Sequence, residues 1–82
     1  MTNELPDLGY YIRQHLEERG WTQVHLAELM QRPLREINDI VAGYREITPE
    51  TAIALARAFD TTPQYWLNQQ MAWDLEETAA ND

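Results

Sequence analysis

The side chains best suited to chemistry in this chain are an arginine and an asparagine in one short amphipathic segment. Arg35 and Asn38 stand three residues apart there, among apolar residues with the i, i+3, i+4 spacing of a helix, namely Ile37, Ile40 and Val41. An arginine can donate two hydrogen bonds to guanine, and an asparagine can pair with adenine. The segment therefore predicts a helix with one buried face and one face able to recognise polar groups such as DNA bases.

No residue pattern in the sequence indicates catalysis or metal binding. His15 and His25 fall in different predicted helices, and the chain has neither a cysteine nor an HExxH spacing. A glycine-rich phosphate loop is missing, and the threonines stand at helix starts without a paired base that could activate them. We therefore expect no enzyme activity, no metal and no cofactor.

Two short helices with a tight connection surround the amphipathic segment. Thr22 can cap the first helix with its hydroxyl, and Pro33 suits the first position of the second because proline has no N–H to satisfy. Gly43 can end that second helix in the left-handed conformation. About three residues separate the two helices, so they must cross at a steep angle. Residues 22–42 therefore carry the signature of a helix-turn-helix, which presents its second helix to the DNA major groove.

Similar start and stop signals predict three further helices. Asp7 can cap a helix that runs to about Arg19, with a glycine directly after it. Thr48-Pro49 and Thr62-Pro63 each combine a hydroxyl cap with a proline at the first helical position. The sequence therefore contains five helix signals in total.

These elements amount to one all-α domain. No segment alternates apolar and polar residues with the period of two that marks a strand. We expect a five-helix domain over residues 7–77, a flexible N-terminus at 1–6 and a flexible tail at 78–82. Because no apolar run is long enough to cross a membrane and cysteine is absent, we expect no membrane association and a cytoplasmic location.

The balance of charge is acidic, with a formal net charge of −8. Residues 60–82 contain five acidic residues and no basic one, whereas residues 21–48 have four acidic residues against three arginines. Every cation is an arginine, which suits paired contacts with phosphate and guanine. Since nucleic-acid binders normally carry a basic surface, we expect modest DNA affinity for one protomer and a requirement for dimerisation.

Several blocks of the sequence resemble one bacterial family. The blocks are GWTQVHLAELM, RPLREINDIVAGYREIT, TPETAIALARAF and TTPQYWLNQQMAWDL, and the match extends from about residue 9 to residue 76. The chain resembles the lambda-repressor-like, Xre-type helix-turn-helix regulators, and most closely the HigA (VapI-like) antitoxin branch. This resemblance implies a homodimeric repressor that binds an operator in double-stranded DNA. It also implies neutralisation of a cognate mRNA-cleaving toxin, which would be a basic protein.

The resemblance assigns roles to individual residues. Gln23 matches the residue that anchors the first helix of the motif on phosphate. The sequence departs from the family at Gln31, where a glycine is usual, and at Tyr44, where a lysine or arginine is usual. Glu36 and Asp39 place acids on or beside the face that would meet DNA, where an acid can accept a hydrogen bond from cytosine. The expected DNA-binding residues are Thr22, Gln23, Arg32, Leu34, Arg35, Asn38, Asp39, Tyr44 and Arg45.

Some of these residues have an alternative structural role. Arg35 has the i, i+4 spacing for an ion pair with Asp39 on a solvated helix. Leu34 could contact the first helix of the motif instead of a thymine methyl group. Arg32 and Arg45 are expected at phosphates, although each would also serve as a simple solubilising charge. The sequence leaves these alternatives open.

Large side chains near the C-terminus indicate a dimer interface. Trp66, Gln70 and Trp73 follow one another at helical spacing in the last predicted helix, and aromatic side chains commonly anchor interfaces. Core packing against Phe59 and Leu55 is the default for Trp66. For Trp73, a dimer contact is favoured over a partly exposed ring. We therefore expect dimerisation through the C-terminal region.

Other functional interpretations follow from the acidic residues and from the family. The acidic residues Glu36, Asp39 and Glu46, together with the net charge, would suit a protein-interaction module that keeps the fold but has lost DNA binding. The same block also occurs as the DNA-binding half of peptidase-linked Xre regulators. If the chain is an antitoxin, residues 74–77 and the pair Glu17 and Glu18 are the acidic candidates for contacting the toxin.

Overall fold

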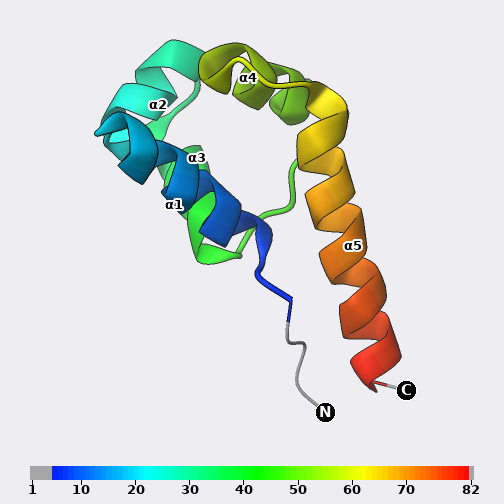
Figure 1. Cartoon of the computed structure of the whole chain (residues 1–82). Helices are drawn as coiled ribbons and strands as arrows, with labels where there is room; N and C mark the ends of the chain where they lie inside the picture. Colours follow the sequence, from blue (N-terminus) through cyan, green and yellow to red (C-terminus); the bar gives the residue numbers. More distant parts are fainter. Residues whose placement is uncertain (1–4, 82) are drawn as a thin grey trace.

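The computed structural model describes residues 5–81, and this part of the chain folds into five helices without a strand. The all-α, five-helix prediction is therefore confirmed. As Figure 1 shows, α1, α2 and α3 form one group, α4 lies across one end of the molecule, and the long α5 runs down the opposite side. The helices are α1 (Leu8–Arg19), α2 (Gln23–Met30), α3 (Leu34–Ala42), α4 (Pro49–Phe59) and α5 (Pro63–Asn81).

Side-chain caps and glycine stops set most of the helix boundaries as predicted. The side-chain oxygens of Asp7, Thr22 and Thr48 each accept a hydrogen bond from the backbone N–H three residues later, at 2.9, 3.1 and 3.2 Å. Gly20 and Gly43 follow α1 and α3 with φ of 68° and 87°, in the left-handed region that glycine enters without steric cost. Short-range chemistry is therefore enough to place these ends.

The start of α3 differs from the prediction by one residue. Pro33 has ψ of 141°, which is extended rather than helical, so it is the N-cap and α3 begins at Leu34. The Pro33 carbonyl accepts the N–H groups of Glu36 and Ile37, at 3.0 and 3.4 Å. The turn before it contains Gln31 in the left-handed conformation, with φ of 55°, at the position where the family usually has glycine.

The C-terminal residues 78–81 are helical, whereas the sequence placed them in a tail. Ala79 and Ala80 are strong helix formers, which agrees with the continuation of α5 to Asn81. Within this part the Thr78 hydroxyl donates to the Asp74 carbonyl at 2.9 Å. Their flexibility stays a prediction. Of the predicted flexible N-terminus, residues 1–4 lie outside the described residues, as does Asp82 of the tail.

The core lies where all five helices converge, and Trp66 is at its centre. Its side chain is fully buried, the Phe59 ring packs on it at 5.5 Å between centroids, and its indole N–H donates to the Thr61 hydroxyl at 2.8 Å. The prediction that Trp66 contributes to a dimer interface is therefore wrong, because this ring cannot reach a second copy. The default prediction, core packing against Phe59, is confirmed.

The C-terminal turn of α3 packs closely against α1. Gly9 is buried, and a Cβ atom at this position would overlap the Val41 carbonyl oxygen. The same carbonyl accepts a hydrogen bond from Arg13 Nη1 at 3.2 Å. Only glycine allows this approach, so the packing of α1 holds the last turn of α3 in place.

The loop between α3 and α4 is attached to α5 by one side-chain amide. Gln70 Nε2 donates to the Ile47 carbonyl at 3.0 Å, and the Ile47 N–H donates to Gln70 Oε1 at 2.8 Å. The amide of Gln70 therefore holds the chain's own backbone, where the sequence had assigned it to a dimer contact. Because the backbone N–H and carbonyl of Ile47 are both hydrogen-bonded, this residue can be buried.

A cationic side chain joins the ends of α1 and α4. Arg19 donates to the His15 carbonyl at 3.1 Å and to the Phe59 carbonyl at 3.0 Å, two carbonyls near helix C-termini. Its guanidinium carbon also lies 5.0 Å from the Phe59 ring centroid and 5.6 Å from that of Trp21. The hydrogen bond to the Phe59 carbonyl and the contact with the Phe59 ring cross from α1 to α4 and hold the two helices together.

His15 is built into the same contact in its neutral form. Arg19 Nη1 lies 3.0 Å from His15 Nδ1, and because arginine can only donate, Nδ1 must be the acceptor. The proton of the neutral ring is then on Nε2, which donates to the Tyr65 hydroxyl at 3.2 Å. Desolvation lowers the pKa of His15 from its usual 6.5, and the positive charge of Arg19 lowers it further.

No helix within residues 5–81 is long and apolar enough to cross a membrane.

This arrangement predicts a pH-dependent stability. Because the pKa of His15 is lower in the folded chain than its usual 6.5, the unfolded chain takes up this proton first as the pH falls. The stability contributed by neutral His15 is thus complete above about pH 6.5 and is lost as the pH falls below it. Urea unfolding followed by circular dichroism should give a free energy of unfolding that decreases from about pH 7.5 to 5.5. His15→Gln should flatten this dependence, and an equal slope in both proteins would contradict the assignment.

Candidate nucleic-acid interface

The orientation of α3 is fixed by the burial of one stripe. Ile37, Ile40 and Val41 lie in the core, where α3 packs against α1 and α2. Arg35 and Asn38 on the outer side are exposed to solvent. The alternation of buried and exposed positions therefore turns the predicted recognition residues outward.

Arg35 is available for an external partner. Its side chain is exposed, and within residues 5–81 no ion pair involves it. The alternative i, i+4 pair with Asp39 is not formed, since the cation nearest to Asp39 is Arg45 at 4.0 Å. Leu34, at the first position of α3, is also exposed.

The other two arginines around α3 are ion-paired through Glu36. Arg45 Nη1 lies 3.2 Å from Glu36 Oε1, and Arg32 Nε lies 3.6 Å from Glu36 Oε2. Arg32 also contacts Glu50, with 3.0 Å between Nη2 and Oε1. The positive charge on either side of the recognition helix is therefore matched by carboxylates of the same chain.

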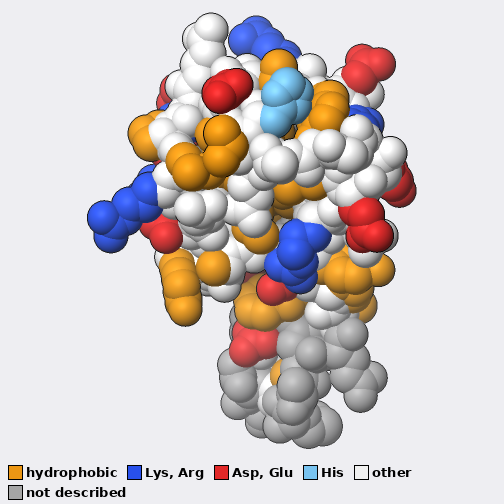
Figure 2. Space-filling model, turned by 90° about the vertical axis from the view of Figure 1, so that its left-hand side faces the viewer, with side chains coloured by type: hydrophobic (Ala, Val, Ile, Leu, Met, Phe, Trp, Pro, Cys, Tyr) orange, Lys and Arg blue, Asp and Glu red, His pale blue; other side chains and the backbone are white. Residues whose placement is uncertain are grey.

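The surface as a whole shows the same mixing of charges. In Figure 2, basic side chains on the left-hand face of the molecule are separated by acidic and apolar ones, and no continuous basic patch is visible there. This distribution agrees with the near-neutral charge of residues 21–48. A strong non-specific attraction for phosphate is not expected from such a face.

The start of α2 and the loop after α3 provide the remaining predicted contacts. Thr22 is exposed, and its hydroxyl caps α2, while Gln23 is half-buried at the first helical position. A helix N-terminus favours an anion because its N–H groups and its dipole point outward. Tyr44 is 85% exposed, although its backbone N–H is held by the Asp39 carbonyl at 2.8 Å. The contacts of these residues with DNA stay a prediction.

The nine predicted residues thus divide into two groups. Leu34, Arg35, Asn38 and Tyr44 expose their side chains, and Thr22 and Gln23 stand at a helix start. The other charged residues, Arg32, Asp39 and Arg45, belong instead to one ion-pair network around Glu36.

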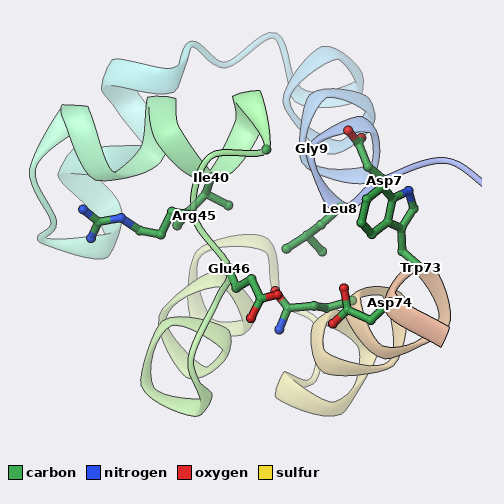
Figure 3. A pocket seen from close by; sticks show the side chains of 10 residues that line it. Asp7, Leu8, Gly9, Ile40, Arg45, Glu46, Trp73 and Asp74 are labelled. Carbon is green, nitrogen blue, oxygen red and sulfur yellow. The ribbon is translucent and has the colours of Figure 1, made fainter. Parts of the chain in front are cut away.

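A small pocket lies behind the loop, between the start of α1, the α3–α4 loop and α5. Its volume is about 130 Å³, and Trp73 contributes to its wall. Figure 3 shows the Trp73 ring beside Asp7 of the same chain and the Arg45 side chain directed away from this pocket. The ring is half-buried. Only its exposed part could contact a second copy, and a dimer contact through Trp73 stays a prediction.

An apolar groove runs along the outer side of α5. Met71 and Leu75 are 56% and 66% exposed, and they are one helical turn apart. The residues that line the groove with them are Gln64, Leu67, Gln70, Asp74 and Thr78. This surface was not expected from the sequence, because the dimer contact had been assigned to the tryptophans. The repeat of Leu67, Met71 and Leu75 at intervals of four was a usable signal for it.

Sequence reasoning also missed the role of Glu36. The i, i+4 spacing of Arg32 and Glu36 was a usable signal for one of its ion pairs. The contact with Arg45 could not be anticipated, because Arg45 lies in the loop beyond Gly43 and its direction depends on how the loop folds back.

Comparison with known proteins identifies the family. The Helix-turn-helix family model matches residues 12–66. Virulence-associated protein I of Dichelobacter nodosus is 38% identical over 77 residues, covering 90% of this chain and 71% of that protein. Antitoxin HigA-1 of Vibrio cholerae is 38% identical over 65 residues, covering 79% of this chain and 61% of that protein. The structure of Pseudomonas aeruginosa antitoxin HigA with the higBA promoter has 32% identity and a TM-score of 0.86, covering 93% and 84% of the two chains.

The similarity agrees with the geometry. The matched segment contains α2, α3 and the turn between them, which is the unit that turns Arg35 and Asn38 outward. The chain therefore belongs to the Xre-type helix-turn-helix family of DNA-binding transcriptional regulators, and its relatives include HigA antitoxins and virulence-associated protein I.

Proposed function

We propose that this protein is a repressor of the HigA-antitoxin type, which inserts α3 into the major groove of an operator. The observation that carries the proposal is the exposed Arg35, which forms no ion pair within residues 5–81, on a helix whose opposite face is buried. Asn38 lies one turn further along the same side, in position for a second base contact. The structure of the related Pseudomonas aeruginosa antitoxin with its promoter supports DNA binding.

The proposed repressor acts as a homodimer. Two copies related by a two-fold axis would place their recognition helices in successive major grooves, with half-sites about 34 Å apart. The groove along α5 with Met71 and Leu75 is the surface we assign to the dimer, because an apolar stripe of this kind is stabilised by burial. Dimerisation compensates for the weak electrostatic attraction of one protomer to DNA.

The antitoxin part of the proposal concerns a basic toxin. The net charge of −8 favours a cationic protein partner. Glu17 and Glu18 expose their side chains on α1, as does Glu76 on α5, and these are our candidates for the contact. A short gene for a basic protein beside this one would support the assignment.

A protein-interaction module without DNA binding is the second candidate function. The ion pairing of Arg32 and Arg45 with Glu36 favours it, because it removes the charges that would otherwise attract phosphate. Salt dependence separates the two functions. A DNA-binding protein loses affinity steeply with added salt, because the release of counterions from the DNA becomes less favourable as the salt concentration rises. A module specific for a protein partner shows no operator binding at any salt concentration.

The principal test is substitution of Arg35 in a DNA titration. Arg35→Ala should weaken binding to the protein's own upstream DNA by roughly tenfold or more, because a bidentate contact with guanine contributes about 1–3 kcal/mol. Fluorescence anisotropy at two salt concentrations, with a scrambled duplex alongside, measures both affinity and specificity. The control is Arg57→Ala, which removes the same charge from an exposed position on α4. Equal binding by Arg35→Ala and the wild-type protein would rule out the proposed contact.

The dimer surface is tested by charge insertion. Leu75→Glu should raise the dimer dissociation constant at least about tenfold, because burying a leucine side chain contributes about 1.5–3 kcal/mol and a buried carboxylate is unfavourable. Sedimentation analysis over a concentration series measures the change. Ala72→Glu adds the same charge at an exposed position on a neighbouring side of α5 and should have a small effect. A dimer that tolerates Leu75→Glu must use another surface.

A further inference from the structure

Glu36 occupies an unusual position for a carboxylate on a recognition helix. Only 14% of its side chain is exposed, and both oxygens face arginines of the same chain. Oε1 accepts a hydrogen bond from Arg45 at 3.2 Å. Oε2 is buried and has no hydrogen-bond partner within residues 5–81, with Arg32 Nε at 3.6 Å as its closest cation. The charge of Glu36 is therefore directed inward, at two cations.

These two cations flank the recognition helix. Arg32 lies in the turn before α3, and Arg45 lies in the loop after it. If α3 enters the major groove, the ends of the helix are the places where the phosphates on either side of the groove come closest. Arg32 and Arg45 are therefore the natural phosphate contacts, and both are already occupied by Glu36.

We propose that Glu36 sets the DNA affinity by competing with operator phosphates for Arg32 and Arg45. The proposal rests on the DNA-binding function argued above. To bind either guanidinium, a phosphate must displace Glu36 from it or share it with Glu36. The phosphate is also repelled by the negative charge of Glu36 itself. Glu36 thereby keeps the affinity of a protomer low, so that stable operator binding requires both halves of a dimer.

Competition accounts for the geometry better than pre-organisation of the arginines for DNA. A carboxylate that only oriented two guanidinium groups would be expected to use both oxygens in hydrogen bonds, yet Oε2 has none within the described part of the chain. Asp39 lies 4.0 Å from Arg45, and Glu50 lies 3.0 Å from Arg32. Each arginine therefore faces two carboxylates, which exceeds what orientation requires and repels an approaching phosphate.

The inference is tested by Glu36→Gln, which keeps the shape of the side chain and removes its charge. Operator affinity at about 0.1 M salt should increase at least tenfold. The slope of log K against log salt should become steeper by up to about two, because each arginine that gains a phosphate releases about 0.9 counterion. Asp60→Asn is the control, since it makes the same charge change at an exposed residue directly after α4 that is outside the ion-pair network. Its salt slope should equal that of the wild-type protein.

A second variant keeps the test valid if Glu36→Gln does not fold. Glu50 is 82% exposed, so Glu50→Gln should fold normally, which circular dichroism verifies, and it removes one of the two carboxylates that face Arg32. Its salt slope should become steeper by at most about one. Affinity that is unchanged or lower in these variants, or raised equally by Asp60→Asn, overturns the inference while leaving the proposed function intact. A folded wild-type protein that does not bind its upstream DNA overturns both.

Discussion

The burial of one stripe of α3 is the constraint on which the functional surface depends. With Ile37, Ile40 and Val41 in the core, the helix has no freedom to rotate, so Arg35 and Asn38 must face outward. The close approach at Gly9 fixes the C-terminal end of α3, and the amide of Gln70 anchors the loop that follows. The recognition face is thus a consequence of packing on its opposite side.

The arginines around this face differ in whether they are ion-paired within the chain. An acidic chain can act on DNA only if its few cations are well placed. Around α3, Arg35 forms no ion pair within residues 5–81, while Arg32 and Arg45 are both paired with Glu36. Under the proposed function, this division separates two tasks. Arg35 supplies base specificity, and the paired Arg32 and Arg45 limit the general attraction to phosphate. Affinity then depends on two protomers acting together.

Local signals in the sequence predicted the fold well, because caps and stops are short-range chemistry. Asp7, Thr22 and Thr48 act as the caps expected of them, and the one-residue error at Pro33 arises because proline suits both the cap and the first helical position. The family resemblance pointed to the recognition helix for the same reason, since its residues are contiguous.

Long-range contacts could not be predicted in this way. Gln70 was assigned to a dimer contact because helical spacing shows which residues share a side of a helix, not that Ile47 lies opposite. The same limit applies to Glu36, whose partner Arg45 arrives through a folded loop. The assignment of Trp66 to an interface failed because the spacing of Trp66 from Gln70 and Trp73 does not show whether the ring is buried in the core or exposed on the surface.

The central claim is that the outer side of α3 is the surface that meets DNA. The most direct measurement is a two-dimensional NMR titration of the labelled protein with its own upstream duplex, followed at the backbone amides. This account predicts that the largest shift changes occur at Leu34, Arg35 and Asn38, with further changes at Gln23 and Tyr44. Bound protein whose α3 amides remain unchanged, with the shifts confined to α1 or α5, would contradict it.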